Sequence, residues 1–473
     1  YIDDTYGWSF VKGSGLVDDQ HGHGTHVAGT IAAVGNNGIG IIGIAPKTQI
    51  LPIQGLNERG SGSHSQLIEA IYYAVNMGAD VINLSWGGYH YSLAIKQAID
   101  YAHQSGVVVI AAAGNDATNA SYHYPSGYEN VMSVGAVNED RELAPFSNYG
   151  DDLDVVAPGQ GILSLLADGS SFEDGYEIIE EKYLAIDGTS MAAPHVSGLA
   201  ALILAAYPEY SPDQVRNQIR NAASRVETGF WNAKYGYGFV DAERVFADDQ
   251  IDQINISIKT PSVHAGGQQH RYVNGKLNVV GTASGSDFEE YVVQIVELID
   301  GRPQFPLFDV IRSSQAINND LLAEVNLEMF EDGEYLVRLA VTSRSGQIFD
   351  SYRTVIIDHQ LKAGWPQMTR AGRSAAMVLG TVAGLQFSDL DGDGAKEIIT
   401  ANDNLVFAWR SDGVLLPGFP LEMAFPLSAG VTVVDLDNDG DQELVFPVEI
   451  KTTLREGSTV FPIYAYHHDA TRV

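Results

Sequence analysis

The first half of the chain alternates short apolar runs with segments of helical pattern. Residues 79–84 and 106–111 are mainly apolar and of strand length, as in parallel strands buried on both faces. Apolar side chains recur at helical spacing between residues 67 and 75, and residues 191–206 are apolar nearly all round, which predicts a core helix. This alternation predicts βαβ units around a parallel sheet over residues 1–246.

In the next segment, apolar residues recur at every second position. Residues 291–296 and 335–341 alternate between the two faces of a strand and are bounded by turn residues such as Glu-Asp-Gly at 331–333. This pattern predicts an all-β sandwich over residues 247–360.

The last part of the chain, residues 361–473, repeats itself. Asp-Leu-Asp-Gly-Asp-Gly at 389–394 returns as Asp-Leu-Asp-Asn-Asp-Gly at 435–440, and Phe-Ala-Trp at 407–409 returns as Tyr-Ala-Tyr at 464–466. Repeat arrays usually need three or more units to bury a core. The final repeat is cut short, so the array is expected to be truncated.

The composition excludes several classes of protein. The 473 residues include 60 acidic and 27 basic side chains, a net charge of −33 with histidine neutral. A field of this sign repels phosphate backbones and anionic membrane surfaces, so we expect no nucleic-acid partner. The absence of cysteine rules out disulfides and thiol catalysis. The longest notable apolar run, residues 198–207, is far shorter than the about 20 residues of a membrane span, so no span is expected.

Three separated motifs carry candidate chemistry. They are His-Gly-His-Gly-Thr-His at 21–26, Ala-Ala-Ala-Gly-Asn at 111–115 and Asp-Gly-Thr-Ser-Met at 187–191. A serine at a helix N-terminus lies among free N–H groups, and its own N–H can help to hold a tetrahedral oxyanion. A side-chain amide at a strand end can supply the second donor. Histidine is the base whose pKa suits a serine hydroxyl near neutral pH.

In this order the motifs resemble those of the subtilisin-like serine peptidases, and the likeness runs over residues 1–246. Ser-Trp-Gly-Gly at 85–88 is similar to the family's substrate-binding strand, and Gly-Ser-Gly at 60–62 to its facing edge. The resemblance implies a doubly wound α/β fold that cleaves internal peptide bonds through an acyl-enzyme. It implies His23 as general base, Ser190 as nucleophile and Asn115 as oxyanion donor. The substrate-binding residues that it implies are Ser85, Trp86, Gly87, Gly88, Gly60, Gly62 and Gly114.

The family's catalytic aspartate has no counterpart in this sequence. It lies on a strand well before the histidine motif, whereas Asp3 and Asp4 fall in a segment like the one after that strand. Asp18 and Asp19 lie too close to His23, in a loop. We therefore assign no catalytic aspartate, and we expect the chain to be a fragment open at both ends. Loss of this carboxylate costs about 10⁴ in kcat in a well-characterised serine protease, so the fragment is expected to be nearly inactive.

The three histidines of the first motif allow an alternative enzyme class. His21, His23 and His26 have the spacing H-x-H-x-x-H, which can hold Zn²⁺ in a metallohydrolase. Thr25 stands where a carboxylate would be expected beside the last histidine. The subtilisin-like motif accounts for all three histidines without a metal.

Two acidic loops in the repeats offer oxygen ligands at positions 1, 3, 5, 7 and 9. The first set is Asp389, Asp391, Asp393, Ala395 through its backbone carbonyl and Glu397, and the second is Asp435, Asp437, Asp439, Asp441 and Glu443. Hard oxygen ligands in this number favour Ca²⁺, and a glycine at position 6 permits the sharp turn. The flanks are strands and position 12 lacks glutamate, which disfavours an EF-hand. The repeats resemble the FG-GAP or VCBS type, which implies a partial β-propeller-like array.

These observations together predict a secreted, calcium-dependent serine endopeptidase that acts on protein or peptide substrates. Secretion is inferred from the family resemblance, the acidity and the calcium loops. A second class remains as an alternative, a calcium-dependent adhesion or scaffold protein with an inactive peptidase domain. Its repeats would then bind a cell-surface or matrix ligand.

Overall fold

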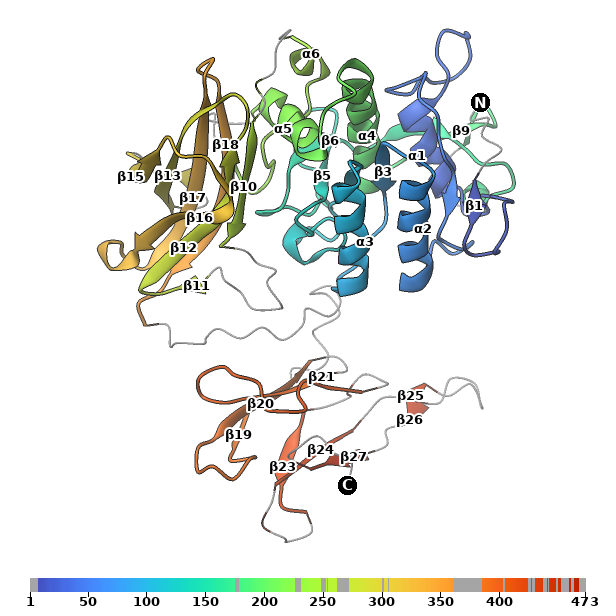
Figure 1. The fold of residues 1–473 in the computed structure, drawn as a ribbon. Helices are drawn as coiled ribbons and strands as arrows, with labels where there is room; N and C mark the ends of the chain where they lie inside the picture. Colours follow the sequence, from blue (N-terminus) through green and yellow to red (C-terminus); the bar gives the residue numbers. More distant parts are fainter. Residues whose placement is uncertain are drawn as a thin grey trace. The chain divides into compact units, whose positions relative to one another are not determined.

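The chain divides into two compact units. Unit 1 comprises residues 1–261, 276–326 and 333–355, and unit 2 comprises 262–275, 327–332 and 356–473. The computed structural model, drawn in Figure 1, describes residues 7–467 apart from 175–177, 226–230, 248–251, 253, 262–271, 300–301, 305, 361–384, 403–404, 424–426, 428–429, 437–439, 441, 448–449, 452–458 and 461–462. The three-part division at residues 246 and 360 stays a prediction.

A four-stranded parallel sheet forms the centre of unit 1. Its strands in spatial order are β3 (Val81–Leu84), β4 (Val108–Ala112), β5 (Met132–Val137) and β6 (Val155–Pro158). Every residue of β4 and β5 is buried, as expected of parallel strands covered on both faces. The predicted strands at 79–84 and 106–111 correspond to β3 and β4.

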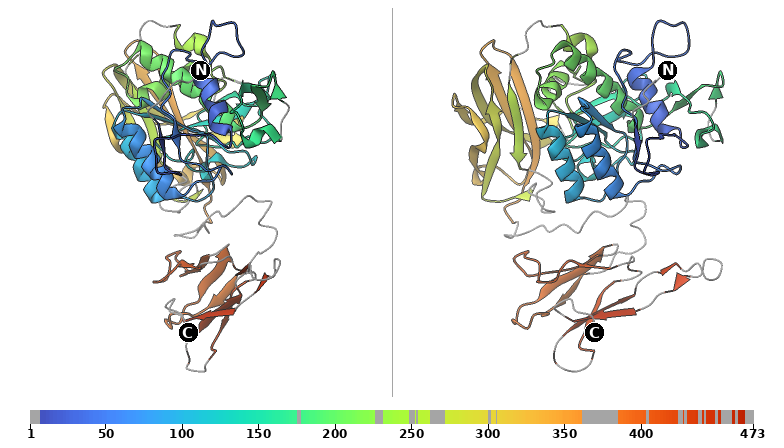
Figure 2. Two further views of the ribbon diagram at one scale, coloured as in Figure 1. Left: turned by 90° about the vertical axis from the view of Figure 1, so that its right-hand side faces the viewer. Right: turned by 45° about the vertical axis from the view of Figure 1, so that its right-hand side comes forward.

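Helices cover both faces of this sheet (Figures 1 and 2). The five longer helices are α1 (His23–Ala32), α2 (His64–Asn76), α3 (Leu93–Gln104), α4 (Thr189–Ala206) and α5 (Pro212–Ala222). Val109 and Ala111 of β4 belong to the same apolar cluster as α2 and α3, whereas Ile110 and Ala112 pack with α4 and α5. Alternate residues of one strand thus face opposite helix layers, which confirms the doubly wound α/β fold.

Shorter elements complete this half of unit 1. They are the parallel pair β1 (Trp8–Ser9) and β2 (Ile53–Gln54), the antiparallel sheet of β7 (Ile162–Leu165), β9 (Tyr183–Ile186) and β8 (Ile178–Ile179), the helix α6 (Ala242–Val245) and the 3₁₀ turns η1 (Ala120–Tyr122) and η2 (Ser171–Asp174). By length and composition α4 could cross a membrane, but 61% of it is buried inside the fold. We therefore interpret α4 as the predicted core helix.

Two antiparallel sheets follow the α/β layers, in agreement with the predicted all-β region. One contains β10 (Asn255–Thr260), β12 (Lys276–Ser284) and β16 (Ile317–Asn326); the other contains β18 (Ile348–Ile357), β17 (Gly333–Ser343), β13 (Phe288–Ile299) and β14 (Arg302–Pro303), with β15 (Phe308–Ser313) beside β13. The rings of Trp231 and Tyr352 stack with centroids 6.1 Å apart, and Tyr237 Oη donates to Asp350 O at 2.9 Å. These contacts join the sandwich to the α/β layers in one core.

Unit 2 contains short antiparallel sheets around the acidic loops. Its elements are β11 (Tyr272–Val273), η3 (Leu327–Met329), β19 (Gln386–Ser388), β20 (Glu397–Asn402), β21 (Leu405–Trp409), β22 (Leu421–Glu422), β23 (Thr432–Val434), β24 (Glu443–Pro447), β25 (Ile450–Lys451), β26 (Thr459–Val460) and β27 (Ile463–Tyr466). The first acidic loop joins β19 to β20, and the second joins β23 to β24. The two repeats therefore place their loops equivalently, between antiparallel strands. The propeller-like arrangement stays a prediction.

A buried charge cluster ties α5 to the parallel sheet. Asp154 is fully buried and accepts hydrogen bonds from Arg216 at 2.8 and 2.9 Å, from Arg220, and from the Ser133 N–H at 2.7 Å. Burial alone would raise the pKa of Asp154, but the two arginines outweigh it and lower this pKa. The cluster is therefore ionised and fully paired.

Replacing Asp154 with Asn should destabilise the fold strongly, because it leaves two largely buried guanidinium groups without the carboxylate that they share. We expect the free energy of unfolding to fall by about 3–5 kcal/mol, measured by chemical denaturation. Glu324→Gln is the control, because Glu324 pairs with Lys276 at 2.7 Å on the surface. It should cost less than about 1 kcal/mol. Equal effects of the two substitutions would contradict the buried-cluster interpretation.

Candidate active site

The carboxyl ends of β3 and β4 meet the first turn of α4. Ser190 is the second residue of α4, and Ser85 directly follows β3. The Ser190 Oγ donates to the Ser85 carbonyl at 3.1 Å, and the Ser85 Oγ donates to the Ser190 carbonyl at 2.8 Å. Two predicted site residues that are far apart in the sequence are thus joined by reciprocal hydrogen bonds.

Asn115 caps the start of α4 from the end of β4. Its Oδ1 accepts hydrogen bonds from both the backbone N–H and the hydroxyl of Thr189, each at 2.8 Å. The Thr189 Oγ1 in turn accepts from the Gly114 N–H at 3.1 Å. With Oδ1 occupied in this way, Nδ2 is the atom of Asn115 that remains to donate. The sequence motif contained Thr189, but its bridging role depends on contacts that the sequence does not show.

His23 begins α1, which packs along α4. The ring of His23 lies edge-on to that of His21, with centroids 6.1 Å apart. Burial, and next the neighbouring imidazole of His21, lower the pKa of His23 from 6.5 to about 4, against the opposing effect of Asp19. The imidazole is therefore neutral at pH 7, as a general base must be. In this structure the Ser190 hydroxyl donates to Ser85 and not to His23.

Asp19 anchors the start of α1. Its Oδ1 accepts from the Gly22 N–H at 2.8 Å, and its Oδ2 accepts from the Thr25 N–H at 2.7 Å and the Thr25 hydroxyl at 2.8 Å. Sequence reasoning missed this role, although an aspartate just before a helix is a typical N-terminal signal. Both oxygens of Asp19 are engaged with α1. In the part of the chain that the structure describes, no carboxylate hydrogen-bonds to the ring of His23.

The three histidines of the first motif have different surroundings. The Nε2 of buried His26 lies 3.0 Å from the Ile162 carbonyl and 3.3 Å from the Leu184 carbonyl, so it donates to the backbone. Among the described residues, His21, His23 and His26 do not form a group whose ligand atoms converge on one metal. This geometry gives the zinc alternative no support.

The predicted substrate-binding residues divide into two groups. One cavity is lined by five of the predicted site residues: His23, Gly60, Ser85, Trp86 and Gly87. Three others, Ser190, Asn115 and Gly62, do not line it. The backbone of Gly88 is already paired, because its N–H donates to Tyr124 O at 2.8 Å and its carbonyl accepts from Tyr124 N at 2.7 Å.

The ring of His123 fills the space between two of the predicted glycines. A Cβ on Gly87 would lie 2.2 Å from the His123 ring, and a Cβ on Gly114 would lie 2.8 Å from it. Glycine is therefore required at both positions, and His123 closes the space between their segments. None of the sequence motifs indicated a role for this histidine.

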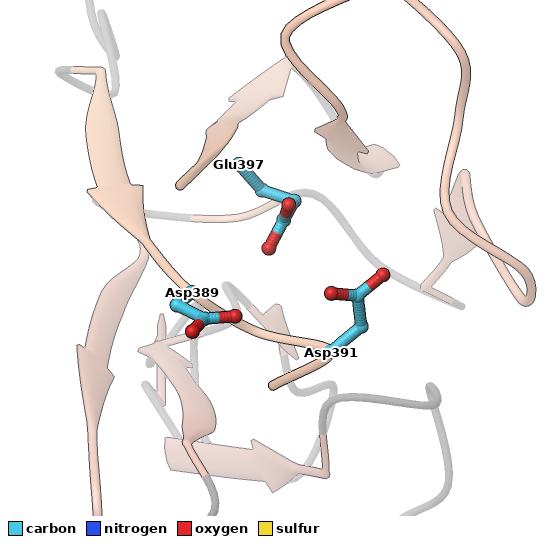
Figure 3. A group of neighbouring side chains, drawn as sticks. All are labelled: Asp389, Asp391 and Glu397. Atoms are coloured by element: carbon cyan, nitrogen blue, oxygen red, sulfur yellow. The ribbon is translucent and has the colours of Figure 1, made fainter. Parts of the chain in front are cut away.

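The first acidic loop of unit 2 gathers three carboxylates (Figure 3). Atoms of Asp389, Asp391 and Glu397 lie within 4.8 Å of one another. Two hydrogen bonds within the loop hold its conformation. The Gly394 N–H donates to Asp389 Oδ2 at 2.9 Å, and the Leu390 N–H donates to Glu397 Oε2 at 2.7 Å. The other oxygens, Asp389 Oδ1 and Glu397 Oε1, are buried and have no hydrogen-bond partner. Partnerless buried oxygens fit a cation.

The second loop repeats this arrangement where it is described. The Gly440 N–H donates to Asp435 Oδ2 at 3.2 Å, and the Leu436 N–H donates to Glu443 Oε2 at 2.7 Å. Asp435 Oδ1 and Glu443 Oε1 again lack a hydrogen-bond partner, although His467 Nδ1 lies 3.4 Å from the latter. The predicted ligands Asp437, Asp439 and Asp441 lie outside the described residues.

Comparison with known proteins finds two family matches along the chain. The subtilase family matches residues 1–238, and an FG-GAP-like repeat matches residues 389–446. Subtilisin DY from Bacillus licheniformis is 42% identical over 240 residues, which are 50% of this chain and 82% of the relative. M-protease from Shouchella clausii (strain KSM-K16) is 43% identical over 238 residues, 50% of this chain and 58% of the relative. Among solved structures, a lanthipeptide protease is 31% identical with a TM-score of 0.46, covering 52% of this chain and 80% of that chain.

The α/β fold and these matches define a serine endopeptidase of the subtilisin type. The chain belongs to the subtilase family, with an FG-GAP-like repeat near its carboxyl end. The predicted family and enzyme class are thereby confirmed.

The buried histidines should make the fold sensitive to acid. Burial lowers the pKa of His26 and His123 from 6.5 to about 4, although carbonyl hydrogen bonds at His26 and the charge of Asp116 at His123 oppose it. The unfolded chain binds these protons near pH 6.5, so unfolding takes up protons between pH 6.5 and about 4. The free energy of unfolding should therefore fall as the pH drops through this window.

Chemical denaturation at pH 7 and at about pH 5 measures this effect. His123→Gln should flatten the pH dependence, because it removes one buried titrating group. His64→Gln is the control, since His64 is exposed at the start of α2. A His123→Gln variant that keeps the full wild-type pH dependence would show that this histidine does not couple folding to pH.

Proposed function

We propose that this protein is a secreted, calcium-binding serine endopeptidase in which Ser190 is the nucleophile, His23 the general base and Asn115 an oxyanion donor. One observation carries the proposal. The helix N-terminus that bears Ser190 is held between the ends of two parallel strands by hydrogen bonds to Ser85 and Asn115. This arrangement brings a hydroxyl, a backbone N–H and an amide N–H to one place.

The chemistry follows from these groups. The Ser190 Oγ leaves the Ser85 carbonyl, transfers its proton to the neutral imidazole of His23 and attacks the substrate carbonyl carbon. The Ser190 N–H and Asn115 Nδ2 donate to the oxyanion that forms, a stabilisation worth about 10²–10³ in kcat for one such donor. His23 then protonates the leaving amine, and water releases the acyl group by the reverse path. An extended substrate would pair with the backbone of residues 85–87, with Gly60 and Gly62 facing it.

Catalysis in this chain would lack one component. The ring of His23 has no carboxylate partner among the described residues, and Asp19 is engaged by α1. Without an orienting carboxylate the imidazole can adopt the wrong tautomer, which costs about 10⁴ in kcat in a well-characterised serine protease. We infer that the described residues, without such a carboxylate, would support only weak peptide cleavage.

Ser190→Ala should remove the remaining peptide cleavage, because it deletes the attacking oxygen. Hydrolysis of a fluorogenic peptide amide at high enzyme concentration measures this activity. Ser65→Ala, at an exposed position of α2, should leave the rate unchanged. Cleavage by Ser190→Ala at the wild-type rate would overturn the assignment of the nucleophile.

The acidic loops support calcium binding in the same protein. Asp389, Asp391, Asp393, Glu397 and the Ala395 carbonyl would hold one ion, and the equivalent residues of the second loop another. A bound cation would neutralise carboxylates that otherwise repel one another. The pKa of Glu397 is raised mainly by burial, and the charges of Asp391, Asp393 and Asp389 raise it further. Free Ca²⁺ is plentiful outside cells, which supports secretion.

Chelation of calcium should lower the thermal stability of unit 2, because ligands that bind only the folded state stabilise it in proportion to ln(1 + [L]/Kd). Calorimetry with added Ca²⁺ and with chelator measures this difference. Glu397→Gln should lose most of the calcium-dependent rise in unfolding temperature. Glu422→Gln, an exposed position in the same repeat, should keep it. The same rise in both variants would exclude Glu397 as a ligand.

A second function rests on the ring of His23, which has no carboxylate partner among the described residues. If no carboxylate ever joins it, the chain is a calcium-dependent adhesion or scaffold protein with an inactive peptidase domain. Its C-terminal repeats would then bind a surface or matrix ligand. Wild-type turnover equal to that of Ser190→Ala in every assembled form of the protein would favour this function.

A further inference from the structure

A basic side chain lies beside the first acidic loop of unit 2. Ile398, the residue after Glu397 in β20, pairs with Trp409, the last residue of β21. Arg410 directly follows Trp409, so the register of the two strands brings it to the level of Glu397. Its Nη2 donates to Asp391 Oδ2 at 2.8 Å. Arg410 therefore forms an ion pair with one of the proposed calcium ligands.

The second repeat has a basic side chain at the same position. Leu444, the residue after Glu443 in β24, pairs with Tyr466, the last residue of β27. His467 directly follows Tyr466, and its Nδ1 lies 3.4 Å from Glu443 Oε1. Arg410 and His467 thus occupy equivalent positions, each close to a carboxylate of its own loop. The contact is a feature of the repeat and not of one isolated surface pair.

Three carboxylates of the first loop each use one oxygen to hold the loop. Asp389 Oδ2 and Glu397 Oε2 accept from loop N–H groups, which leaves Asp389 Oδ1 and Glu397 Oε1 buried and without a hydrogen-bond partner. Asp391 follows the same pattern, because its Oδ1 accepts from the Asp393 N–H at 3.3 Å. Its second oxygen, Oδ2, is the one to which Arg410 donates.

Arg410 therefore holds the oxygen of Asp391 that is left for a cation. The carboxyl groups of Asp389, Asp391 and Glu397 point toward a common space, and atoms of all three lie within 4.8 Å of one another (Figure 3). A guanidinium on Asp391 Oδ2 keeps a positive charge at the edge of this space, where it repels an entering cation. The ion pair of Arg410 and the binding of a cation thus oppose each other.

The side chain of Arg410 can leave Asp391 while its backbone stays in place. The side chains of Arg410 and Asp391 are 45% and 21% exposed, and exposed ion pairs of this kind are weak. The Arg410 N–H donates to Val414 O at 2.8 Å, which fixes the main chain. A divalent cation gains several carboxylate oxygens at once, so it prevails over a single guanidinium.

We propose that Arg410 is a built-in competitor of the cation at the first acidic loop: it holds Asp391 Oδ2 while the loop is empty and is displaced when Ca²⁺ binds. In the empty loop the guanidinium offsets the repulsion between the carboxylates. On binding, its displacement raises the Ca²⁺ concentration at which the loop fills. This inference rests on the proposed calcium binding and adds the regulation of that site.

Calorimetric titration of the full chain with Ca²⁺ tests the proposal. Glu397→Gln first identifies the binding component of the first loop, because it removes a ligand there. Arg410→Gln keeps most of the side chain but not its charge, and it should lower the Kd of that component roughly fivefold, as release of an exposed ion pair predicts. Lys396→Gln is the matched control. Lys396 is exposed in the same loop and has no ion pair to a ligand in the described part of the chain, so the Kd should change less than about twofold.

The outcomes separate this proposal from calcium binding itself. If Glu397→Gln removes no binding component, the first loop does not bind calcium and both proposals fail there. If it removes a component whose Kd is unchanged or raised in Arg410→Gln, calcium binding stands and Arg410 is not a competitor. An equal decrease of the Kd in Lys396→Gln would assign the effect to overall charge and would overturn the role of the Arg410 contact.

Chemical labelling of arginine tests the displacement independently. The protein is treated with phenylglyoxal in Ca²⁺ or in chelator, and the rate of modification at each arginine is followed by peptide mass mapping. Calcium should speed the modification of Arg410, because the displaced guanidinium has lost its carboxylate partner. Arg312, which pairs with Glu290 in unit 1, is the control and should react at the same rate in both conditions. Unchanged or slower labelling of Arg410 in Ca²⁺ would show that it stays on Asp391 and would overturn the proposal.

Discussion

The close packing of α4 against the parallel sheet is the constraint on which the site depends. Ala192, Ala193, Val196 and Ala200 are fully buried in the cluster that contains β4 and β5. A Cβ on Gly198 would come within 2.6 Å of the side chain of Ile44, which lies in the loop after α1, so glycine also permits the close approach of this loop to α4. With small residues along its buried side, the helix lies deep in the core. Its first turn is thereby held at the carboxyl ends of β3 and β4.

The same packing gives Asn115 a structural role beside the catalytic one that we propose for it. Its Oδ1 accepts two hydrogen bonds from Thr189 and so caps α4. This fixes the amide plane and leaves Nδ2 to donate. A donor positioned by a structural contact needs no reorganisation during reaction, which is the physical basis of oxyanion stabilisation. In the proposed mechanism, the stability of the helix start and the chemistry of the site therefore depend on the same two hydrogen bonds.

Much of this arrangement is predictable from sequence because its signals are local. The apolar runs at 79–84 and 106–111 locate β3 and β4, and the apolar segment at 191–206 locates α4. The motif around Ser190 identifies the family, which the comparisons confirm. Such signals can be read from the sequence because each depends on residues that are close together in the chain.

Other features depend on contacts between distant residues and leave no local signal. The backbone of Gly88 is occupied by Tyr124, and the Ser190 hydroxyl is turned to the Ser85 carbonyl. The proposed metal ligands are predictable only in part. Their spacing is visible in the sequence, but the partnerless oxygens of Asp389 and Glu397 are found only in the folded loop.

The most direct test of the central claim is the intact mass of the protein after exposure to a serine-reactive fluorophosphonate, followed by mapping of the labelled residue. The protein is folded and loaded with calcium. The account predicts a single adduct on Ser190, because only an activated nucleophile with a working base and oxyanion site reacts in this way. The absence of an adduct, or labelling of another serine, would contradict it and favour the binding-scaffold function.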